Sequence, residues 1–217
     1  MGAHSGPNIV NDGLRFVADV NNIKSYSGSG NSWENVIDNY QSTGTSIPSV
    51  FNAPDWLSST LTEVSVIAIV EVIGSDTVYA YNPVSKWNNT SDATFVLYHF
   101  QQWTDNLRTN MFGWYANRGS TWGAVSSQYF SDPGNTYIFA LQYNSTDGGL
   151  MWINGEKYGS RLGSGVLASS TNNIRIDGGP VERSGIHHTK NVLIYDRELT
   201  DDEMVQNYQS LRSTYGI

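Results

Sequence analysis

A polar stretch around one tryptophan, "HFQQWTDNLRTN" at residues 99–110, holds the side chains of this chain best suited to binding chemistry. An indole can stack on the apolar face of a sugar ring, while carboxamide, carboxylate and guanidinium groups hydrogen-bond its hydroxyls. The candidate ligand-binding residues are therefore Trp103, Gln101, Asp105, Asn106 and Arg108. The alternative, that Trp103 fills the protein core as bulky residues of a sandwich do, stays open.

Acidic residues are not spaced as a hydrolase would need them. Glycosidases commonly place two carboxylates close together, for example on one face of a strand. Glu71 and Asp76 instead flank a predicted turn, and the acids at 201–203 fit the first turn of a helix. The Gly-rich stretches lack the sequence of a phosphate loop, and no Ser-His-Asp order is present. We therefore expect a protein that is not an enzyme.

Composition excludes several partners. The net charge is −8, from 12 basic and 20 acidic residues, which disfavours nucleic acid and anionic membranes. The longest apolar run, 64–73, is about half a membrane span, so no membrane insertion is expected. The start "MGAHSGPNIV" has no basic region followed by an apolar run and predicts no signal peptide. Without cysteine, the fold needs no disulfide and can form in a reducing cytosol.

Short alternating segments bounded by Gly, Asn, Ser or Pro predict an all-β fold. We expect strands at 13–20, 64–73, 76–82, 93–100, 110–117, 121–128, 136–144, 149–155, 173–179 and 190–198. Segment 64–73 is apolar on both alternations, which predicts a central strand covered on both faces. Asn154-Gly155 predicts a type I′ hairpin turn, because both positions need positive φ. The spacing favours a two-sheet antiparallel sandwich over βαβ units.

One domain is expected, because no Pro/Ser-rich or charged linker of useful length appears. The small, polar residues 1–8 are interpreted as a flexible N-terminal arm. The sandwich domain is assigned to 9–217, including a C-terminal helix at 201–215.

The predicted helix has clear start and stop signals. Thr200 and Glu203 form a capping-box pattern, and Gly216 is placed as a C-terminal stop. An apolar stripe repeats at i, i+4, i+7 and i+11 through Met204, Tyr208, Leu211 and Tyr215. We expect this stripe to cover one end of the sandwich. Docking on another protein or subunit stays open, so the same four residues are candidate partner-docking residues.

Both ends of the chain resemble one known family. The opening "GPNIVNDGLRFVADVNNIKSYSGSGNSWENVIDN" and the closing "NVLIYDRELTDDEMVQNYQSLRSTYGI" look like the two ends of a concanavalin A-like, laminin G-like domain. More narrowly, they resemble single-domain versions among virion proteins of marine tailed bacteriophages. The resemblance implies a two-sheet jelly-roll sandwich with a short helix after the last strand.

The same resemblance implies a non-enzymatic virion protein, structural or accessory, that decorates the capsid or sits on the tail. Its partners would be other virion proteins and its location the virion, assembled in the host cytoplasm. A homo-oligomer is compatible with this role. The alternative is a glycan-binding adhesin domain for attachment to the host surface.

The resemblance also bears on calcium, which many relatives of this kind hold. Aligning "SWENVIDN" puts Asn35 where the family usually has an acid, and Lys190 stands where an acid often precedes the last strand. Because calcium prefers carboxylate oxygens, only Asp38 could compensate, and no metal or other cofactor is expected. His187 and His188 add no metal site, since neighbours on a strand point to opposite faces, and "GIHHTK" is interpreted as a solvated loop.

Overall fold

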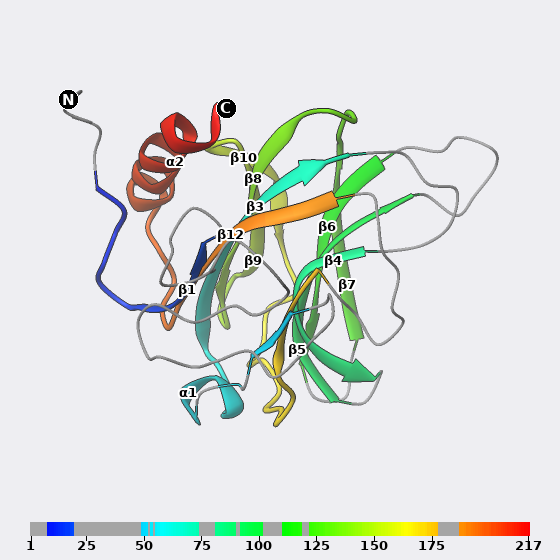
Figure 1. Cartoon of the computed structure of the whole chain (residues 1–217). Coiled ribbons are helices and arrows are strands. Elements are labelled where there is room, and N and C mark those ends of the chain that lie inside the picture. Colours follow the sequence, from blue (N-terminus) through cyan, green and yellow to red (C-terminus); the bar gives the residue numbers. More distant parts are fainter. Residues whose placement is uncertain are drawn as a thin grey trace.

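The computed structural model of the chain describes residues 8–19, 49–51, 53, 55–73, 81–89, 92–101, 110–118, 122–177 and 187–217. Their strands form two six-stranded sheets in which neighbouring strands pair antiparallel. Sheet 1 has the order β1 (Leu14–Asp19), β12 (His187–Tyr195), β3 (Glu63–Val72), β8 (Thr136–Asn144), β9 (Gly148–Ile153) and β10 (Glu156–Leu162). Sheet 2 has the order β2 (Ser49–Phe51), β11 (Ile174–Ile176), β4 (Tyr81–Asn89), β5 (Asp92–Gln101), β6 (Asn110–Asn117) and β7 (Trp122–Phe130). The helices are α1 (Asp55–Ser58) and α2 (Asp201–Tyr215) (Figure 1). The predicted all-β sandwich with one C-terminal helix is confirmed.

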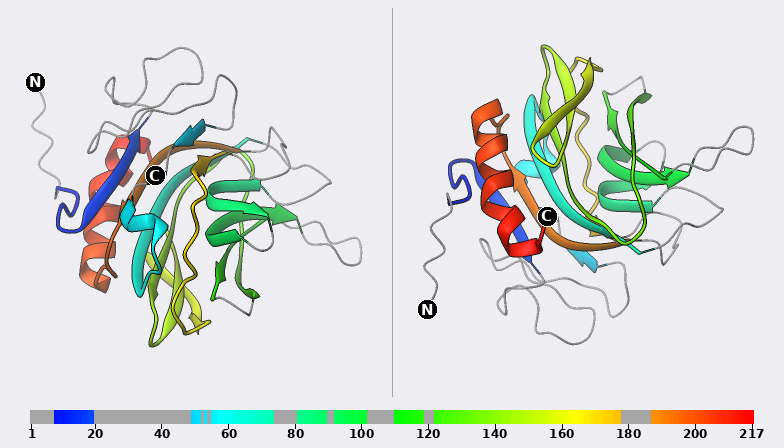
Figure 2. Two further views of the ribbon diagram at one scale, coloured as in Figure 1. Left: turned by 90° about the horizontal axis from the view of Figure 1, so that it is seen from below. Right: turned by 90° about the horizontal axis from the view of Figure 1, so that it is seen from above.

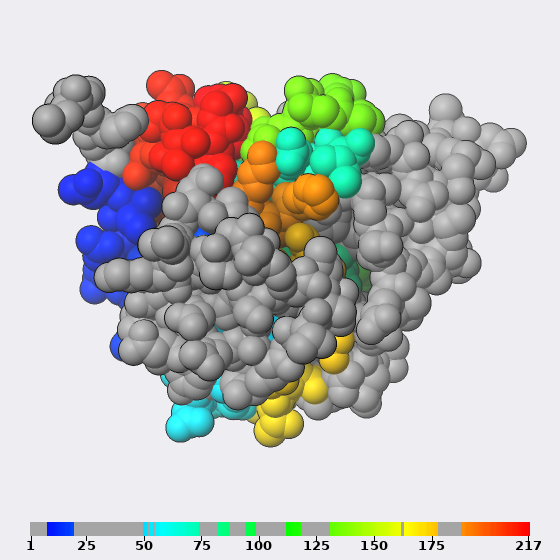
Figure 3. Space-filling model, viewed as in Figure 1, coloured from blue at the N-terminus to red at the C-terminus, as the bar shows by residue number. Residues whose placement is uncertain are grey.

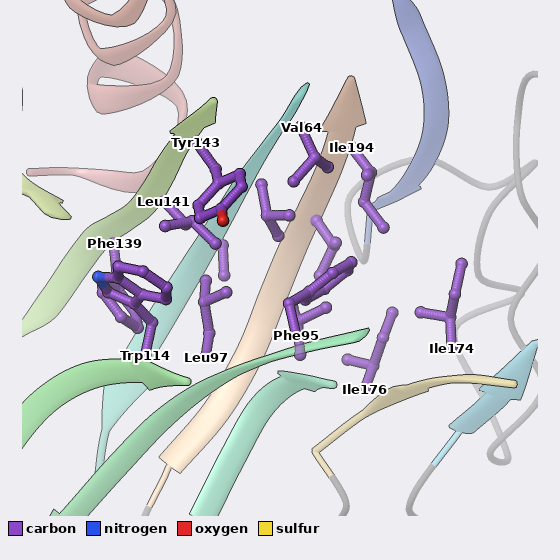
Figure 4. Packing of buried hydrophobic residues seen from close by; sticks show 14 of the residues in the cluster. Val64, Phe95, Leu97, Trp114, Phe139, Leu141, Tyr143, Ile174, Ile176 and Ile194 are labelled. Atoms are coloured by element: carbon purple, nitrogen blue, oxygen red, sulfur yellow. The ribbon is translucent and has the colours of Figure 1, made fainter. Parts of the chain in front are cut away.

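The main core lies between the two sheets. Alternate residues of each inner strand point into it, as Val64, Val66 and Val70 of β3 do. Figure 4 shows side chains of sheet 1, among them Leu141 and Tyr143, facing Phe95 and Leu97 of sheet 2. Trp114 is fully buried here, which confirms for this tryptophan that bulky rings fill the sandwich.

A second apolar layer covers the opposite face of sheet 1. Ile67 and Ile69 of β3 point to this face, where Trp152 and Leu193 join them beneath α2. Both faces of β3 are therefore buried, as its apolar alternations predicted. Figure 2 shows α2 on the side of sheet 1 that faces away from sheet 2, so the molecule has three layers.

Helix α2 has the ends that the sequence predicted. The Thr200 hydroxyl accepts a hydrogen bond from Glu203 N, the Glu203 carboxylate accepts one from Thr200 N, and Gly216 is left-handed at φ 71°. Met204 and Leu211 of the stripe are buried against sheet 1, and Tyr208 and Tyr215 pack beside them. The stripe thus covers the chain's own sheet. Whether a partner protein docks at these four residues stays a prediction.

The N-terminal residues run beside this helix. Val10 N donates to Asn207 Oδ1 at 2.9 Å, and Gln206 Nε2 donates to the carbonyl of Asn8 at 2.8 Å. Except for Asn8, the predicted arm at 1–8 lies outside the described residues. These contacts tie the two ends of the described chain together on one face of sheet 1 (Figure 1).

Two predictions need correction. Of the strand expected at 76–82, residues 76–80 lie outside the described residues, and β4 spans Tyr81–Asn89, so the sequence missed that the polar "SKWNN" lies within a strand. Lys86 is fully buried there because its ammonium donates to the carbonyls of Ser170 and, at 2.9 Å, Asn172. The expected loop at "GIHHTK" is also wrong for its last four residues, since β12 begins at His187 and pairs His188 with Glu71, while the first two residues lie outside the described ones.

Glu203 stabilises the first turn of α2 through an ion pair as well as through its capping hydrogen bond. Its carboxylate accepts hydrogen bonds from Arg197 Nη1 and Nη2 at 2.8 and 2.6 Å, besides the one from Thr200 N. The Arg197 hydrogen bonds, helped by those of Thr200 and opposed by burial, lower the pKa of the Glu203 carboxyl to about 2.

Replacing Glu203 by glutamine should lower the free energy of unfolding at neutral pH by about 1–2 kcal/mol. Because the folded-state pKa lies below the usual 4.5, the carboxylate stabilises the fold above pH 4.5, and this stabilisation is lost as the pH falls towards 2. Urea denaturation should therefore show wild type and variant converging over that interval. Asp202→Asn, an exposed acid of the same turn, is the control, with an expected change below about 0.5 kcal/mol. A difference that stays constant down to about pH 3 would show that the charge of Glu203 does not stabilise the turn.

Candidate functional site

An open polar recess lies at the end of sheet 1 where β7 connects to β8. Its volume is about 460 Å³. It is lined by Asp132, Gly134, Asn135, Thr136, Tyr137, Asn154, Gly216 and Ile217. Figure 3 shows the surfaces of the β7–β8 connection (lime) and of the C-terminal end of α2 (red) side by side.

The β7–β8 connection is shaped by a tight turn. Asn135 N donates to Asp132 O at 3.4 Å, and Gly134 between them has φ +88°, as a type II turn with Pro133 before the glycine requires. Gly134 N donates to Val72 O at 2.7 Å, and Val72 N donates to Asn135 O at 2.9 Å. The turn is therefore fixed to the end of β3.

The opposite wall comes from the β9–β10 hairpin. Asn154 and Gly155 have φ of 50° and 79°, which confirms the predicted type I′ turn. Asn154 Oδ1 accepts a hydrogen bond from Ile138 N at 2.8 Å, and Asn154 N donates to Ile138 O at 2.9 Å. These bonds orient the carboxamide, so its Nδ2 is the end left for a ligand.

Helix α2 closes the recess from the side. A Cβ atom on Gly155 would lie only 2.4 Å from Cδ1 of Tyr208, so the hairpin turn packs directly on the helix. Gly216 and Ile217, just after α2, then line the recess. Tyr137, which is 5% exposed, also lines the recess, and its hydroxyl accepts a hydrogen bond from Asp132 N at 2.8 Å.

Four polar groups of the recess have no hydrogen-bond partner within the described part of the chain: the Asp132 carboxylate, the Asn135 carboxamide, the Thr136 hydroxyl and Nδ2 of Asn154. They combine strong acceptors with amide and hydroxyl donors. Neighbouring hydroxyls of a sugar also donate and accept, so this set matches a carbohydrate better than a group that only accepts. The lining shows one side-chain carboxylate among the described residues, not the pair that glycoside hydrolysis uses.

Only one of the five ligand-binding residues predicted at 99–110 is described by the structure. Gln101 ends β5 and pairs with Asn110 of β6, while Trp103, Asp105, Asn106 and Arg108 lie outside the described residues. Met111 pairs with Phe130, the last residue of β7, so the ends of β5 and β6 that flank residues 102–109 lie at the same end of the sandwich as the recess. Its role in binding stays a prediction.

The expectation that the chain holds no metal stays untested. Asn35 and Asp38 lie outside the described residues. In the described ranges, no group of three or more His, Cys, Asp or Glu side chains is placed to hold an ion. Lys190, which stands where an acid was expected from the family pattern, has its ammonium 3.2 Å from Glu71 Oε2. Among the described helices, none is both long and apolar enough to cross a bilayer.

Sequence reasoning missed the recess. Its signals are the Asp-Pro-Gly-Asn turn before β8 and the Asn-Gly turn after β9, both recognisable as turns. What the pattern could not show is that β8 pairs with both β3 and β9 and so brings the two turns together.

No protein-family model matches the chain, and no curated protein sequence matches it. Solved structures match in fold. Trypanosoma rangeli sialidase in complex with sialic acid has a TM-score of 0.59 at 13% identity, over 97% of this chain and 35% of the sialidase chain. The binding domain of botulinum neurotoxin serotype D has a TM-score of 0.58 at 13% identity, over 93% and 52%. Domain 4 of the extracellular arabinanase AbnA from Geobacillus stearothermophilus, in complex with arabinotriose, has 0.55 at 15% identity, over 90% and 98%.

These likenesses show the fold, a β-sandwich of the jelly-roll, concanavalin A-like kind. The chain spans about a third of the length of the sialidase chains that it matches. The jelly-roll part of the family resemblance is thus confirmed, and the link to phage virion proteins stays a prediction.

Proposed function

We propose that this β-sandwich binds a glycan, with the recess between the β7–β8 turn and the β9–β10 hairpin as its site. The observation that carries the proposal is the set of four polar groups without a hydrogen-bond partner among the described residues, at the β7–β8 turn, the first residue of β8 and the β9–β10 turn. Preorganised donors and acceptors lose little conformational entropy on binding, and this favours affinity. With a single side-chain carboxylate among the described lining residues, we propose binding without hydrolysis.

The structural neighbours support the same function class. Two of them carry carbohydrate in their solved complexes, sialic acid in the sialidase and arabinotriose in domain 4 of the arabinanase. A third is the binding domain of a neurotoxin. Fold alone does not assign function, so the proposal depends on the polar groups of the recess.

Two near-isosteric changes test the site. Thr136→Val removes a hydroxyl, and Asn154→Asp replaces the free amide donor by an acceptor while keeping the oxygen that Ile138 N uses. Each should weaken binding of the strongest hit from a glycan array by about tenfold, the effect of one lost hydrogen bond. Titration calorimetry would measure the affinity, and thermal unfolding would show that the fold is intact.

Thr146→Val is the matched control, because this exposed threonine lies in the turn at the other end of β8. It should leave the affinity unchanged. An array without any hit at high protein concentration would count against glycan binding altogether. Hits whose affinity is the same in wild type, Thr136→Val and Asn154→Asp would place the site elsewhere, with the predicted Trp103 loop the first alternative.

We propose further that such a glycan-binding sandwich acts on a phage particle, as a tail-associated adhesin or capsid decoration that contacts other virion proteins. The support is the resemblance of the two chain ends to that group of proteins. Mass spectrometry of purified particles would detect the chain, and its copy number would distinguish capsid from tail. Its absence from particles would overturn the virion role and leave glycan binding untouched.

A further inference from the structure

We infer that the recess selects uncharged glycans and rejects those carrying a carboxylate or sulfate at the bound sugar. The inference rests on the proposed function and specifies the ligand class of the same site. It follows from three features of the recess. Its side-chain charge is negative, the backbone N–H groups of its turn are already hydrogen-bonded, and its polar side chains can bond the hydroxyls of a sugar.

The charge of the recess is negative. Asp132 is the one charged side chain among the described lining residues, and it is exposed and without a hydrogen-bond partner in the described chain. Glu71, the strand partner of Thr136, lies close by along sheet 1, but the charge of its carboxylate is paired with that of Lys190 and adds no net charge. Lys190 is engaged with that carboxylate at 3.2 Å and does not line the recess. An anionic sugar would meet repulsion without a compensating cation.

Backbone amides cannot replace the missing cation. Sites that hold anions commonly do so with several free N–H groups of a turn. Here Asp132 N donates to the Tyr137 hydroxyl, Gly134 N to Val72 O, and Asn135 N to Asp132 O, while Pro133 has no N–H. The backbone donors of this turn are therefore already used inside the protein.

The same groups suit a neutral diol. The two oxygens of the Asp132 carboxylate can accept hydrogen bonds from adjacent sugar hydroxyls, and hydrogen bonds to an ionised acceptor are the stronger kind. Nδ2 of Asn154 can donate to a sugar oxygen from the facing wall, and the Thr136 hydroxyl can do either. Each donor and acceptor of the recess therefore finds a partner on an uncharged sugar.

The test uses matched pairs of oligosaccharides that share one core and differ in a terminal sialic acid or a sulfate. On a glycan array and by titration calorimetry, the wild-type chain should bind the neutral member about tenfold or more tightly than the acidic member. The preference should shrink at high ionic strength, because salt screens the repulsion by an exposed carboxylate.

Asp132→Asn separates charge from shape. It should weaken binding of the neutral member about three- to tenfold and reduce the preference over the acidic member by a similar factor. Asp202→Asn makes the same change in net charge at an exposed position in the first turn of α2 and should leave both values unchanged. Thermal unfolding of each variant checks that the fold is retained.

The outcomes distinguish the two proposals. If neither member of any pair binds, the proposed function fails. If glycans bind, but acidic members bind as well as neutral ones or Asp132→Asn leaves their ratio unchanged, the inference is overturned and glycan binding stands.

Discussion

Trp114→Ala is expected to lower the free energy of unfolding by about 4 kcal/mol, a large loss for a single substitution. Trp114 is fully buried between the sheets, and its ring meets that of Tyr143 edge to face with centroids 6.0 Å apart. The indole also lies directly on β9, because a Cβ atom on Gly149 would be 2.2 Å from it. Removing the ring leaves a cavity that both sheets border and that neither can fill without moving (Figure 4).

Trp114→Phe is the matched control for this prediction. The indole Nε1 has no hydrogen-bond partner among the residues that the structure describes, so phenylalanine removes volume without breaking a hydrogen bond there. We expect a loss of about 1–2 kcal/mol for this variant. Urea denaturation followed by circular dichroism would measure both. If Trp114→Ala lowered the free energy of unfolding by less than about 1 kcal/mol, the Trp114 ring would not contribute substantially to the packing between the two sheets.

Gly155→Ala is expected to destabilise the fold by about 2–3 kcal/mol and to disturb the recess as well. The φ of 79° strains an alanine, and the added Cβ would lie 2.4 Å from Cδ1 and 3.1 Å from Cβ of Tyr208. Because the nearest atoms include those close to the Tyr208 backbone, the helix itself must shift. Gly216 and Ile217 after α2 would move with it, and glycan affinity should fall.

Gly134→Ala separates backbone strain from the clash. Gly134 has a similar φ of 88° but no atom within 4 Å of the added Cβ, so we expect a loss of about 1 kcal/mol from strain alone. In the double variant Gly155→Ala with Tyr208→Ala, the destabilisation should be less than the sum of the two single effects. Thermal and urea unfolding would supply the numbers. Equal losses of unfolding free energy for the two glycine variants, or additive effects in the double variant, would show that the Gly155 turn and Tyr208 of α2 are not in tight steric contact.

Local signals predicted much of this fold. The capping-box pattern at Thr200 and Glu203 and the stop at Gly216 define α2 to the residue, because these groups act within one turn. Asn154-Gly155 marks its hairpin for the same reason. Segment 64–73 indicated a strand buried on both faces because apolar side chains occupy both of its alternations.

Prediction failed where distant residues decide the outcome. Lys86 lies in a strand that its polarity argues against, and carbonyls of Ser170 and Asn172, far along the chain, make its burial tolerable. The sequence around Lys86 does not indicate these two hydrogen bonds, because their acceptors lie more than 80 positions further along the chain.

The recess escaped prediction for a similar reason. Asp132 and Asn154 stand in separate turns, and only the pairing of β8 with β3 and β9 brings them to one cavity. The aromatic pattern that pointed to Trp103 is a local signal, whereas the recess is made of small polar residues that also serve as ordinary turn formers.

The most direct test of the proposed site is nuclear magnetic resonance of the isotope-labelled chain titrated with its strongest neutral glycan. We predict that the side-chain amide signals of Asn135 and Asn154 and the backbone amide signals of Asp132 and of 134–136 shift together, with one common Kd. Signals of the β8–β9 turn at 145–147 should stay in place. Unmoved recess signals, with shifts confined to the Trp103 indole or to another face of the sandwich, would contradict the assignment of this site.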